Sequence, residues 1–154
     1  MDLNFLSSLR GGALLTAVKE NGEINTMTVS WGGVGILWGK EVAFIFVRPQ
    51  RYTYTFTEDK CKMTLSFFDD SKKDTLTFCG TKSGRDIDKI KECGLKYKLE
   101  NGYPVFEDAV FTLRLSKMYS DTFKKEHFID TESLKWYKND DFHTMYICEI
   151  SQAI

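Results

Sequence analysis

The sequence predicts one domain over residues 1–154 that is mostly β, with a few short helices, its strands forming a closed or partly closed barrel. The 154 residues are about one domain's worth and suffice to bury a hydrophobic core. Short apolar or alternating runs of strand length recur along the chain, and aromatic residues, which suit pleated, half-buried surfaces, make up 14%. With this many strands, a barrel is the economical way to remove exposed edges.

The first predicted unit is a β-hairpin. Ala13–Glu20 leads into Asn21–Gly22, a pair favoured in type I′ turns, and Glu23–Trp31 returns. The second half of the returning strand alternates apolar side chains with small polar ones. Its polar face is either a solvated exterior or the wall of a polar ligand site.

The next segments predict a strand and a helix. Residues 32–39 contain four glycines, which make the backbone there more flexible. Glu41–Arg48 is then a nearly continuous apolar run, as expected of a strand covered on both sides. The following proline ends that strand. Tyr52–Lys60 has helical character, with Thr53 or Thr55 as its N-cap.

The rest of the chain predicts further strands separated by short helices and turns. The expected elements are, in order, a strand, a short helix or turn, a helix, a turn and two strands: Lys62–Phe68, Lys72–Cys79, Ser83–Cys93, Asn101–Gly102, Phe111–Tyr119 and His143–Ile150. Gly94 is in the position that commonly ends a helix.

Charge and composition exclude several classes of function. The formal net charge is −1 with acids and bases interspersed, which gives neither a footprint for nucleic acid nor a polybasic membrane anchor. Arg10 and two glycines interrupt the apolar segment Phe5–Val18, so we expect neither a signal peptide nor a membrane span. Four cysteines and two histidines lack the close spacing of a zinc site, so we expect no metal and free thiols in a reducing cytoplasm.

Two segments place cations beside groups that suit a phosphate. In Val47–Phe56, Arg48 and Arg51 flank a proline-led turn, and hydroxyl side chains follow where a helix should begin. In Cys79–Lys89, two glycines allow close backbone approach beside a serine and two cations. By itself the first segment is as typical of a surface loop with an N-cap threonine, and the second is more typical of a capped surface helix.

Three motifs occur together: N-x-M-T-x-S-W at residues 25–31, R-P-Q-R-Y-T at 48–53 and S-G-R-D-I-D-K at 83–89. The combination, order and spacing of these motifs resemble those of the flavin-reductase-like, flavoredoxin-type FMN proteins. The resemblance covers most of the chain. The resemblance implies an FMN-binding split β-barrel of the Greek-key type. It also implies a homodimer with FMN near the subunit interface.

The resemblance further implies roles for individual residues. One group would run along the flavin ring and ribityl chain: Asn25, Met27, Thr28, Ser30 and Trp31. A second would hold the phosphate: Arg48, Arg51, Tyr52 and Thr53. A third would close the site from another loop: Ser83, Gly84 and Lys89. No side chain is assigned as acid or base, because the cofactor performs the chemistry in such proteins.

The last predicted strand departs from the family's pattern, which often reads Asp-His-Thr, an apolar stretch, Gly and Glu. Here Phe142 separates Asp141 from His143, and Cys148 stands where glycine is expected. We therefore expect His143 to be a solvated or structural residue and Cys148 to be a small buried hydrophobe.

The expected function is that of an FMN-binding oxidoreductase that moves electrons from NADH or NADPH, or from a redox-partner protein, through bound FMN. The alternative is a non-catalytic carrier or sensor of flavin, and a third reading is a cofactor-free barrel that serves only as an assembly unit. Trp31 and Trp38 suit either self-association or the core, and the core is the preferred interpretation.

Overall fold

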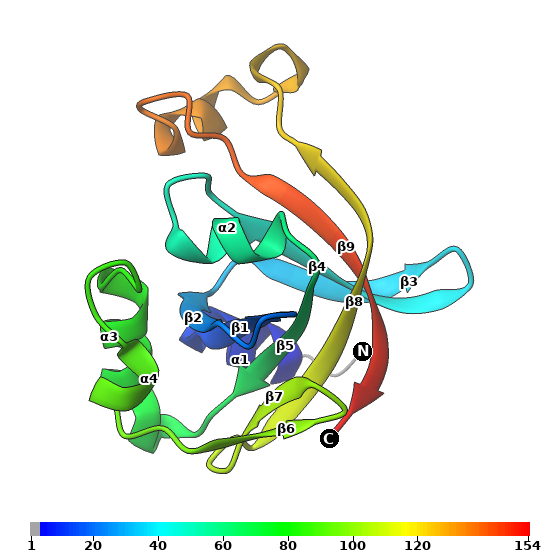
Figure 1. The fold of residues 1–154 in the computed structure, drawn as a ribbon. Coiled ribbons are helices and arrows are strands. Elements are labelled where there is room, and N and C mark those ends of the chain that lie inside the picture. Colours follow the sequence, from blue (N-terminus) through cyan, green and yellow to red (C-terminus); the bar gives the residue numbers. More distant parts are fainter. Residues whose placement is uncertain (1–3) are drawn as a thin grey trace.

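The chain is organised around a seven-stranded antiparallel sheet with the strand order β2-β1-β5-β8-β9-β4-β3 (Figure 1). The structure, a computed structural model, describes residues 4–154. The strands of this sheet are β1 (Ala13–Lys19), β2 (Ile24–Val29), β3 (Gly32–Leu37), β4 (Lys40–Val47), β5 (Cys61–Phe67), β8 (Phe111–Thr122) and β9 (Thr144–Ala153). A separate hairpin consists of β6 (Tyr97–Glu100) and β7 (Tyr103–Phe106).

Short helices connect the strands. The α-helices of the described residues are α1 (Asn4–Gly11), α2 (Tyr52–Thr57), α3 (Lys73–Thr81) and α4 (Lys89–Glu92), and 3-10 turns cover Asp70–Lys72, Lys125–His127 and Thr131–Trp136. The last two turns belong to the segment 123–143, which joins β8 to β9. Figure 1 shows this segment gathered at one end of the sheet.

The strand order is that of a Greek key. The chain runs β5-β8-β9 as neighbouring antiparallel strands, and β4, which precedes β5 in sequence, lies beside β9. The two edge strands are β2 and β3, which follow each other in the chain without pairing. The barrel is therefore split, and the predicted fold class is confirmed.

Two hydrophobic clusters stabilise the barrel. One fills the concave side of the sheet, with residues such as Leu15, Ile45, Phe56 and Leu65 almost fully buried. The other, which includes Leu14, lies between β1, α3, α4 and β7. Both faces of β1 are thus covered, and its buried Thr16 hydroxyl is paired with that of Thr26 at 2.8 Å.

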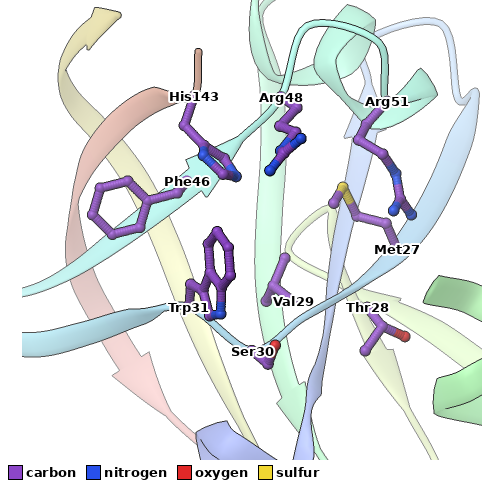
Figure 2. A pocket seen from close by; sticks show the side chains of 9 residues that line it. All are labelled: Met27, Thr28, Val29, Ser30, Trp31, Phe46, Arg48, Arg51 and His143. Atoms are coloured by element: carbon purple, nitrogen blue, oxygen red, sulfur yellow. The ribbon is translucent and has the colours of Figure 1, made fainter. Parts of the chain in front are cut away.

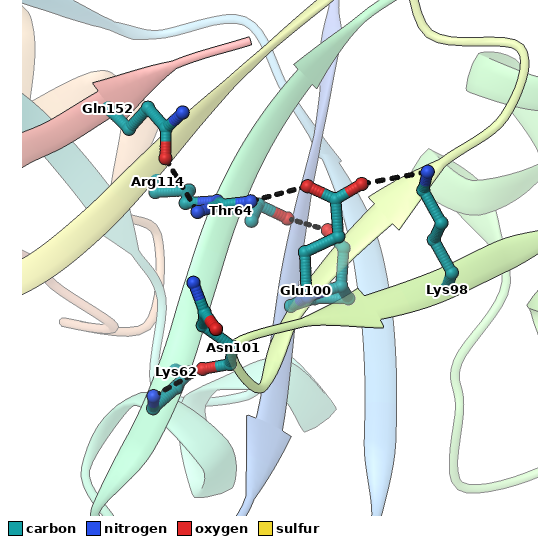
Figure 3. Close-up of polar contacts among 8 residues, drawn as sticks. Lys62, Thr64, Lys98, Glu100, Asn101, Arg114 and Gln152 are labelled. Carbon is teal, nitrogen blue, oxygen red and sulfur yellow. Dashed lines mark hydrogen bonds and ion pairs between the residues drawn. The ribbon is translucent and has the colours of Figure 1, made fainter.

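The β6–β7 hairpin is attached to β5 and β8 by polar contacts (Figure 3). Thr64 Oγ1 donates to the Pro104 carbonyl at 2.8 Å, and the Arg114 guanidinium pairs with the Glu100 carboxylate. Gln152 accepts a further bond from Arg114 at 2.6 Å. The Arg114 side chain is only 8% exposed, so this ion pair places a cation inside the protein.

The predicted β1–β2 hairpin is confirmed, but its turn type is wrong. The loop has three residues, with Lys19 N donating to the Glu23 carbonyl and Gly22 alone at φ +88°. This pattern is typical of a type I turn followed by a bulge, because a type I′ turn also requires positive φ at the asparagine. Asn101–Gly102, where both residues have positive φ, is the two-residue turn that joins β6 to β7.

Two helix predictions need correction. The helix from Tyr52 ends at Thr57, and its N-cap is Arg51, without a side-chain capping bond. Ser83–Cys93 contains only the short helix α4, which Asp88 caps by accepting from Lys91 N. The Ser83 hydroxyl instead accepts from Arg85 N at 3.2 Å, so the residues before Asp88 form a turn.

Local sequence patterns did not predict α1, the strand pair β6 and β7, or the glycine-rich strand β3. β3 forms despite its glycines because it pairs with β4 along its whole length, from Gly32 opposite Ile45 to Leu37 opposite Lys40. The core interpretation of the tryptophans is wrong, since Trp31 is 46% and Trp38 is 57% exposed. Cys148 is fully buried, as expected.

Candidate functional site

A small cavity lies where β2 and β4 end and β9 begins (Figure 2). It has a volume of about 140 Å³ and is lined by Met27, Thr28, Val29, Ser30, Trp31, Phe46, Arg48, Arg51 and His143. Met27 and Val29 also reach into the core, which fixes the strand that forms one wall. The cavity therefore has a rigid β2 wall and faces residues from two distant parts of the chain.

The β2 wall is held against α3. Thr28 Oγ1 donates to the Leu76 carbonyl at 2.5 Å, and Gly80 lies close to the Thr28 side chain, since a Cβ on Gly80 would be 3.3 Å from Thr28 Cβ. Because α3 carries this contact, its C-terminal carbonyls are brought next to the cavity.

The opposite wall is aromatic and includes the segment 123–143. The Trp31 ring lies 5.2 Å from that of Trp136 and 5.5 Å from that of His143. The Arg48 guanidinium donates to Asp141 at 3.1 Å and to the Trp136 carbonyl at 2.8 Å. Arg48 thus joins the end of β4 to this segment, and its charge is matched by a carboxylate.

Two further cations converge on the last turn of α3. Arg51 donates to the carbonyls of Gly80 at 3.0 Å and Cys79 at 3.4 Å, and Lys89 Nζ donates to the Cys79 carbonyl at 3.0 Å. A second bond from Lys89 goes to the Lys82 carbonyl at 3.2 Å. Burial, and then the nearby charge of Arg51, lower the pKa of Lys89 to about 8.

A second, larger hollow of about 520 Å³ lies on the other side of these cations, lined in part by Asn25, Tyr52, Gly84 and Lys89. Asn25 Nδ2 donates to Thr53 Oγ1 at 2.8 Å, which joins β2 to α2. Arg85 donates to the Gln50 carbonyl at 3.0 Å, and its guanidinium lies 5.2 Å from the centre of the Tyr52 ring.

The fold brings most of the predicted residues together in two adjoining places. Those in the cavity are Met27, Thr28, Ser30, Trp31, Arg48 and Arg51, and those in the second hollow are Asn25, Tyr52, Gly84 and Lys89. Thr53 and Ser83 lie outside both linings: Thr53 is buried and holds Asn25, and Ser83 stabilises its own turn. His143 was expected to be a solvated or structural residue. It is buried, and its side chain also lines the cavity.

Sequence reasoning missed the contributions of Asp141, Trp136 and Tyr137. They lie in the irregular segment 123–143, where no periodicity predicts which side chains point toward β4. Phe46 lies in the apolar strand β4, where its sequence does not distinguish it from core residues. Among the residues without an assigned role, only Arg85 could have been found from the sequence, because it belongs to the third motif. In the structure it lies next to Tyr52.

Three cations next to the two hollows suit an anion. Within residues 4–154, no ion pair joins Arg51, Arg85 or Lys89 to a carboxylate, and the hydrogen bonds of their side chains go to backbone carbonyls. Arg85 and Lys89 line the second hollow, whose lining also includes Glu23, Asp86 and Asp88, and Arg51 lines the adjoining cavity. A phosphate bound beside them would meet cations that no carboxylate pairs. The donor set of this structure therefore fits the phosphate of a flavin nucleotide.

The described part of the chain contains no cluster of three or more His, Cys, Asp or Glu side chains arranged to hold a metal ion. In the same residues, no helix has the length and apolar character to cross a membrane.

Fold and site together define a class: a Greek-key split barrel with an aromatic cavity and, beside it, a hollow near which three cations have no ion pair. The family model for the flavin reductase like domain matches residues 7–153. The chain belongs to that family.

Solved structures share the fold at low sequence identity. An FMN-binding protein from Thermus thermophilus with bound p-hydroxybenzaldehyde has a TM-score of 0.71 at 19% identity, over 94% of this chain and 71% of that one. Flavoredoxin of Desulfovibrio vulgaris (Miyazaki F) gives 0.72 at 17%, over 93% and 68%. The styrene monooxygenase flavin reductase of Pseudomonas putida S12 gives 0.65 at 15%, over 93% and 78%. No curated protein sequence matches this chain significantly.

Proposed function

We propose that this domain, residues 1–154, binds FMN and uses it as an oxidoreductase of the flavin-reductase-like type. The observation that carries the proposal is the set of three cations without carboxylate partners beside a cavity walled by β2 and aromatic rings. FMN has the same division, with an anionic phosphate at one end and a planar ring at the other.

The chain's own residues would divide the work of binding. Arg51 and Lys89, with Arg85 beside them, would hold the phosphate, and Gly84 would let the backbone approach it. The β2 residues Asn25, Met27, Thr28, Ser30 and Trp31 would orient the ring and ribityl chain, with Tyr52, Thr53 and Ser83 supporting the phosphate end. Arg48 would act on the ring side, because Asp141 already matches its charge.

When bound, FMN supplies the redox chemistry, and the protein supplies position and electrostatics. NADH or NADPH is the proposed electron donor, and a redox-partner protein is the alternative source of electrons. The known neighbours support this choice, since one is a flavin reductase and another a flavoredoxin. Four free cysteines are consistent with the reducing cytoplasm that we propose as the compartment.

A homodimer is part of the proposal. Ile36 and Trp38, on the β3–β4 hairpin, and Tyr119 on β8 are 73%, 57% and 46% exposed, and the rings of Trp38 and Tyr119 lie 6.4 Å apart. Exposed apolar side chains grouped in this way are typical of a protein interface.

The test is an absorbance spectrum of the purified protein before and after anaerobic addition of NADH. Protein that is yellow and bleaches supports an FMN oxidoreductase. Yellow protein that keeps its colour with NADH and with NADPH favours the carrier or sensor function. Protein that shows no flavin signal, even on titration with FMN, refutes the proposed function.

A further inference from the structure

His143 has an unusual environment for the wall of a ligand cavity. It immediately precedes β9, is 7% exposed, and is enclosed by the rings of Trp31, Phe46, Phe123 and Tyr137 at 5.4–6.5 Å. Figure 2 shows its imidazole pointing into the cavity, near Arg48 and Trp31. It is therefore one of the polar groups that a ligand in this cavity would meet, together with Thr28, Ser30, Arg48 and Arg51.

The two ring nitrogens of His143 differ in their contacts. Nδ1 lies 2.6 Å from the hydroxyl oxygen of Tyr137. Nε2 has no hydrogen-bond partner among residues 4–154. It is not one of the buried side-chain atoms that lack a partner, so solvent can reach it. Nε2 is thus the nitrogen left open toward the cavity.

The contact with Tyr137 determines which nitrogen carries the proton. Burial, and then the charge of Arg48, lower the pKa of His143 to about 4, so the ring is neutral near pH 7. Burial raises the pKa of Tyr137, so its hydroxyl keeps its proton. Within the described residues this hydroxyl has no acceptor other than Nδ1. The arrangement that satisfies the hydroxyl is the one in which it donates to Nδ1, and that arrangement leaves the imidazole proton on Nε2.

We propose that Tyr137 is a positioning residue that holds His143 as the Nε2–H tautomer, so that the cavity wall opposite β2 presents a hydrogen-bond donor to a carbonyl oxygen of a planar second substrate. The aromatic wall favours a planar ligand. The proposal rests on the proposed function only in treating this ligand as the substrate that receives electrons.

The first measurement is the ¹⁵N spectrum of the two histidines in the flavin-loaded protein near pH 7, with the exposed His127 as an internal reference. The chemical shifts of Nδ1 and Nε2 distinguish the two neutral tautomers. We expect His143 to be in the Nε2–H form only. A predominant Nδ1–H form overturns the proposal, and this result needs no variant to fold.

The second measurement compares Tyr137→Phe with Tyr97→Phe, a control whose hydroxyl makes no hydrogen bond within residues 4–154. In Tyr137→Phe we expect a mixture of both tautomers, and an affinity for acetophenone about two- to tenfold lower than in the wild type. Ethylbenzene, which has the same ring but lacks the carbonyl, should bind equally to all three proteins. An unchanged tautomer in Tyr137→Phe, or an equal loss of affinity for both ligands, contradicts the proposal.

These measurements are independent of the outcome for flavin. The tautomer and the affinity for acetophenone are also measurable on flavin-free protein, so failure to bind FMN refutes the proposed function and leaves this inference testable. Conversely, protein that is yellow and bleaches with NADH but shows the Nδ1–H tautomer retains its proposed function and loses the role of Tyr137.

Discussion

Gly84 packs so tightly against Asn25 that a Cβ atom on Gly84 would lie 2.1 Å from Asn25 Oδ1. Asn25 belongs to β2, Gly84 to the turn before α4, and the Asn25 amide is itself bonded to Thr53 on α2. Tyr52 is also close, with its Cδ1 2.8 Å from the same hypothetical Cβ. One glycine therefore lets three separate elements meet beside the second hollow.

Gly84→Ala should weaken FMN binding and lower the stability of the fold. The added methyl group must displace the Asn25 side chain or the turn, and such overpacking costs about 1–3 kcal/mol. Denaturant unfolding and FMN titration measure the two effects. Gly33→Ala, where a Cβ meets nothing within 4 Å, is the matched control. Equal stability and equal FMN affinity in the two variants would show that the turn can move to accommodate the added methyl group.

Arg51→Glu should reduce FMN affinity by about a hundredfold or more, because it replaces a half-buried cation of the phosphate site with an anion. The barrel should stay folded, since Arg51 bonds only to carbonyls at the edge of α3. Fluorescence titration with FMN and circular dichroism measure binding and folding. Lys96→Glu, the same charge reversal at an exposed residue outside both hollows, should bind FMN normally. Unchanged affinity in Arg51→Glu would rule out the proposed phosphate site.

FMN affinity should decrease as the pH rises through about 8, the pKa of Lys89 in the free protein. Above that value the ammonium loses its proton, and binding of the phosphate must restore it, so affinity falls by up to about tenfold per pH unit. Titrations with FMN from pH 7 to 10 measure this slope. In Lys89→Met the affinity should be lower throughout, and its decline with pH should be absent.

The same pKa has the opposite consequence for the flavin-free fold. The folded state binds fewer protons than the unfolded state between about pH 8 and the ordinary lysine value of 10.5. The contribution of Lys89 to the free energy of unfolding therefore rises with pH across that window. Urea unfolding of wild type and Lys89→Met at several pH values would reveal it as a difference in slope.

Glu100→Gln should lower the melting temperature, because it removes the carboxylate that pairs with the buried Arg114 guanidinium. Arg114 Nε already has no hydrogen-bond partner, so among the described residues Gln152 would be the remaining acceptor for this cation. Lys98→Gln, which removes an exposed partner of the same carboxylate, should melt close to the wild type. Calorimetry compares them, and equal melting temperatures for both variants would mean that solvent reaches Arg114.

Trp38→Ser should raise the dissociation constant of the proposed dimer about thirtyfold, since tryptophan at an interface is commonly a hot spot that contributes much of the binding energy. Sedimentation velocity across a range of concentrations measures the change. Leu99→Ser, at a residue that is 52% exposed on β6, is the control and should leave association unaltered. A wild-type protein that sediments as a monomer at every concentration would remove the dimer from the proposed function.

Local patterns were enough to place most strands. The apolar run at residues 41–48 and the alternation after Phe111 reflect burial that each strand carries in its own sequence, so β4 and β8 were predicted. β3 was missed because its glycines carry no such pattern, and its stability comes from pairing with β4. The Ser83–Cys93 helix was overpredicted, because local capping residues do not reveal that Gly84 must pack against Asn25.

The sequence by itself determined the class of fold, the family and the set of residues from which the site is built, because motifs and periodicity are local properties of the chain. Only the tertiary structure decided how those residues divide. It paired Arg48 with Asp141 and left Arg51 and Lys89 without a carboxylate. It also brought Tyr137 to His143. These relationships depend on contacts between side chains held by different elements, and no local pattern specifies which partner each charge or ring nitrogen will find.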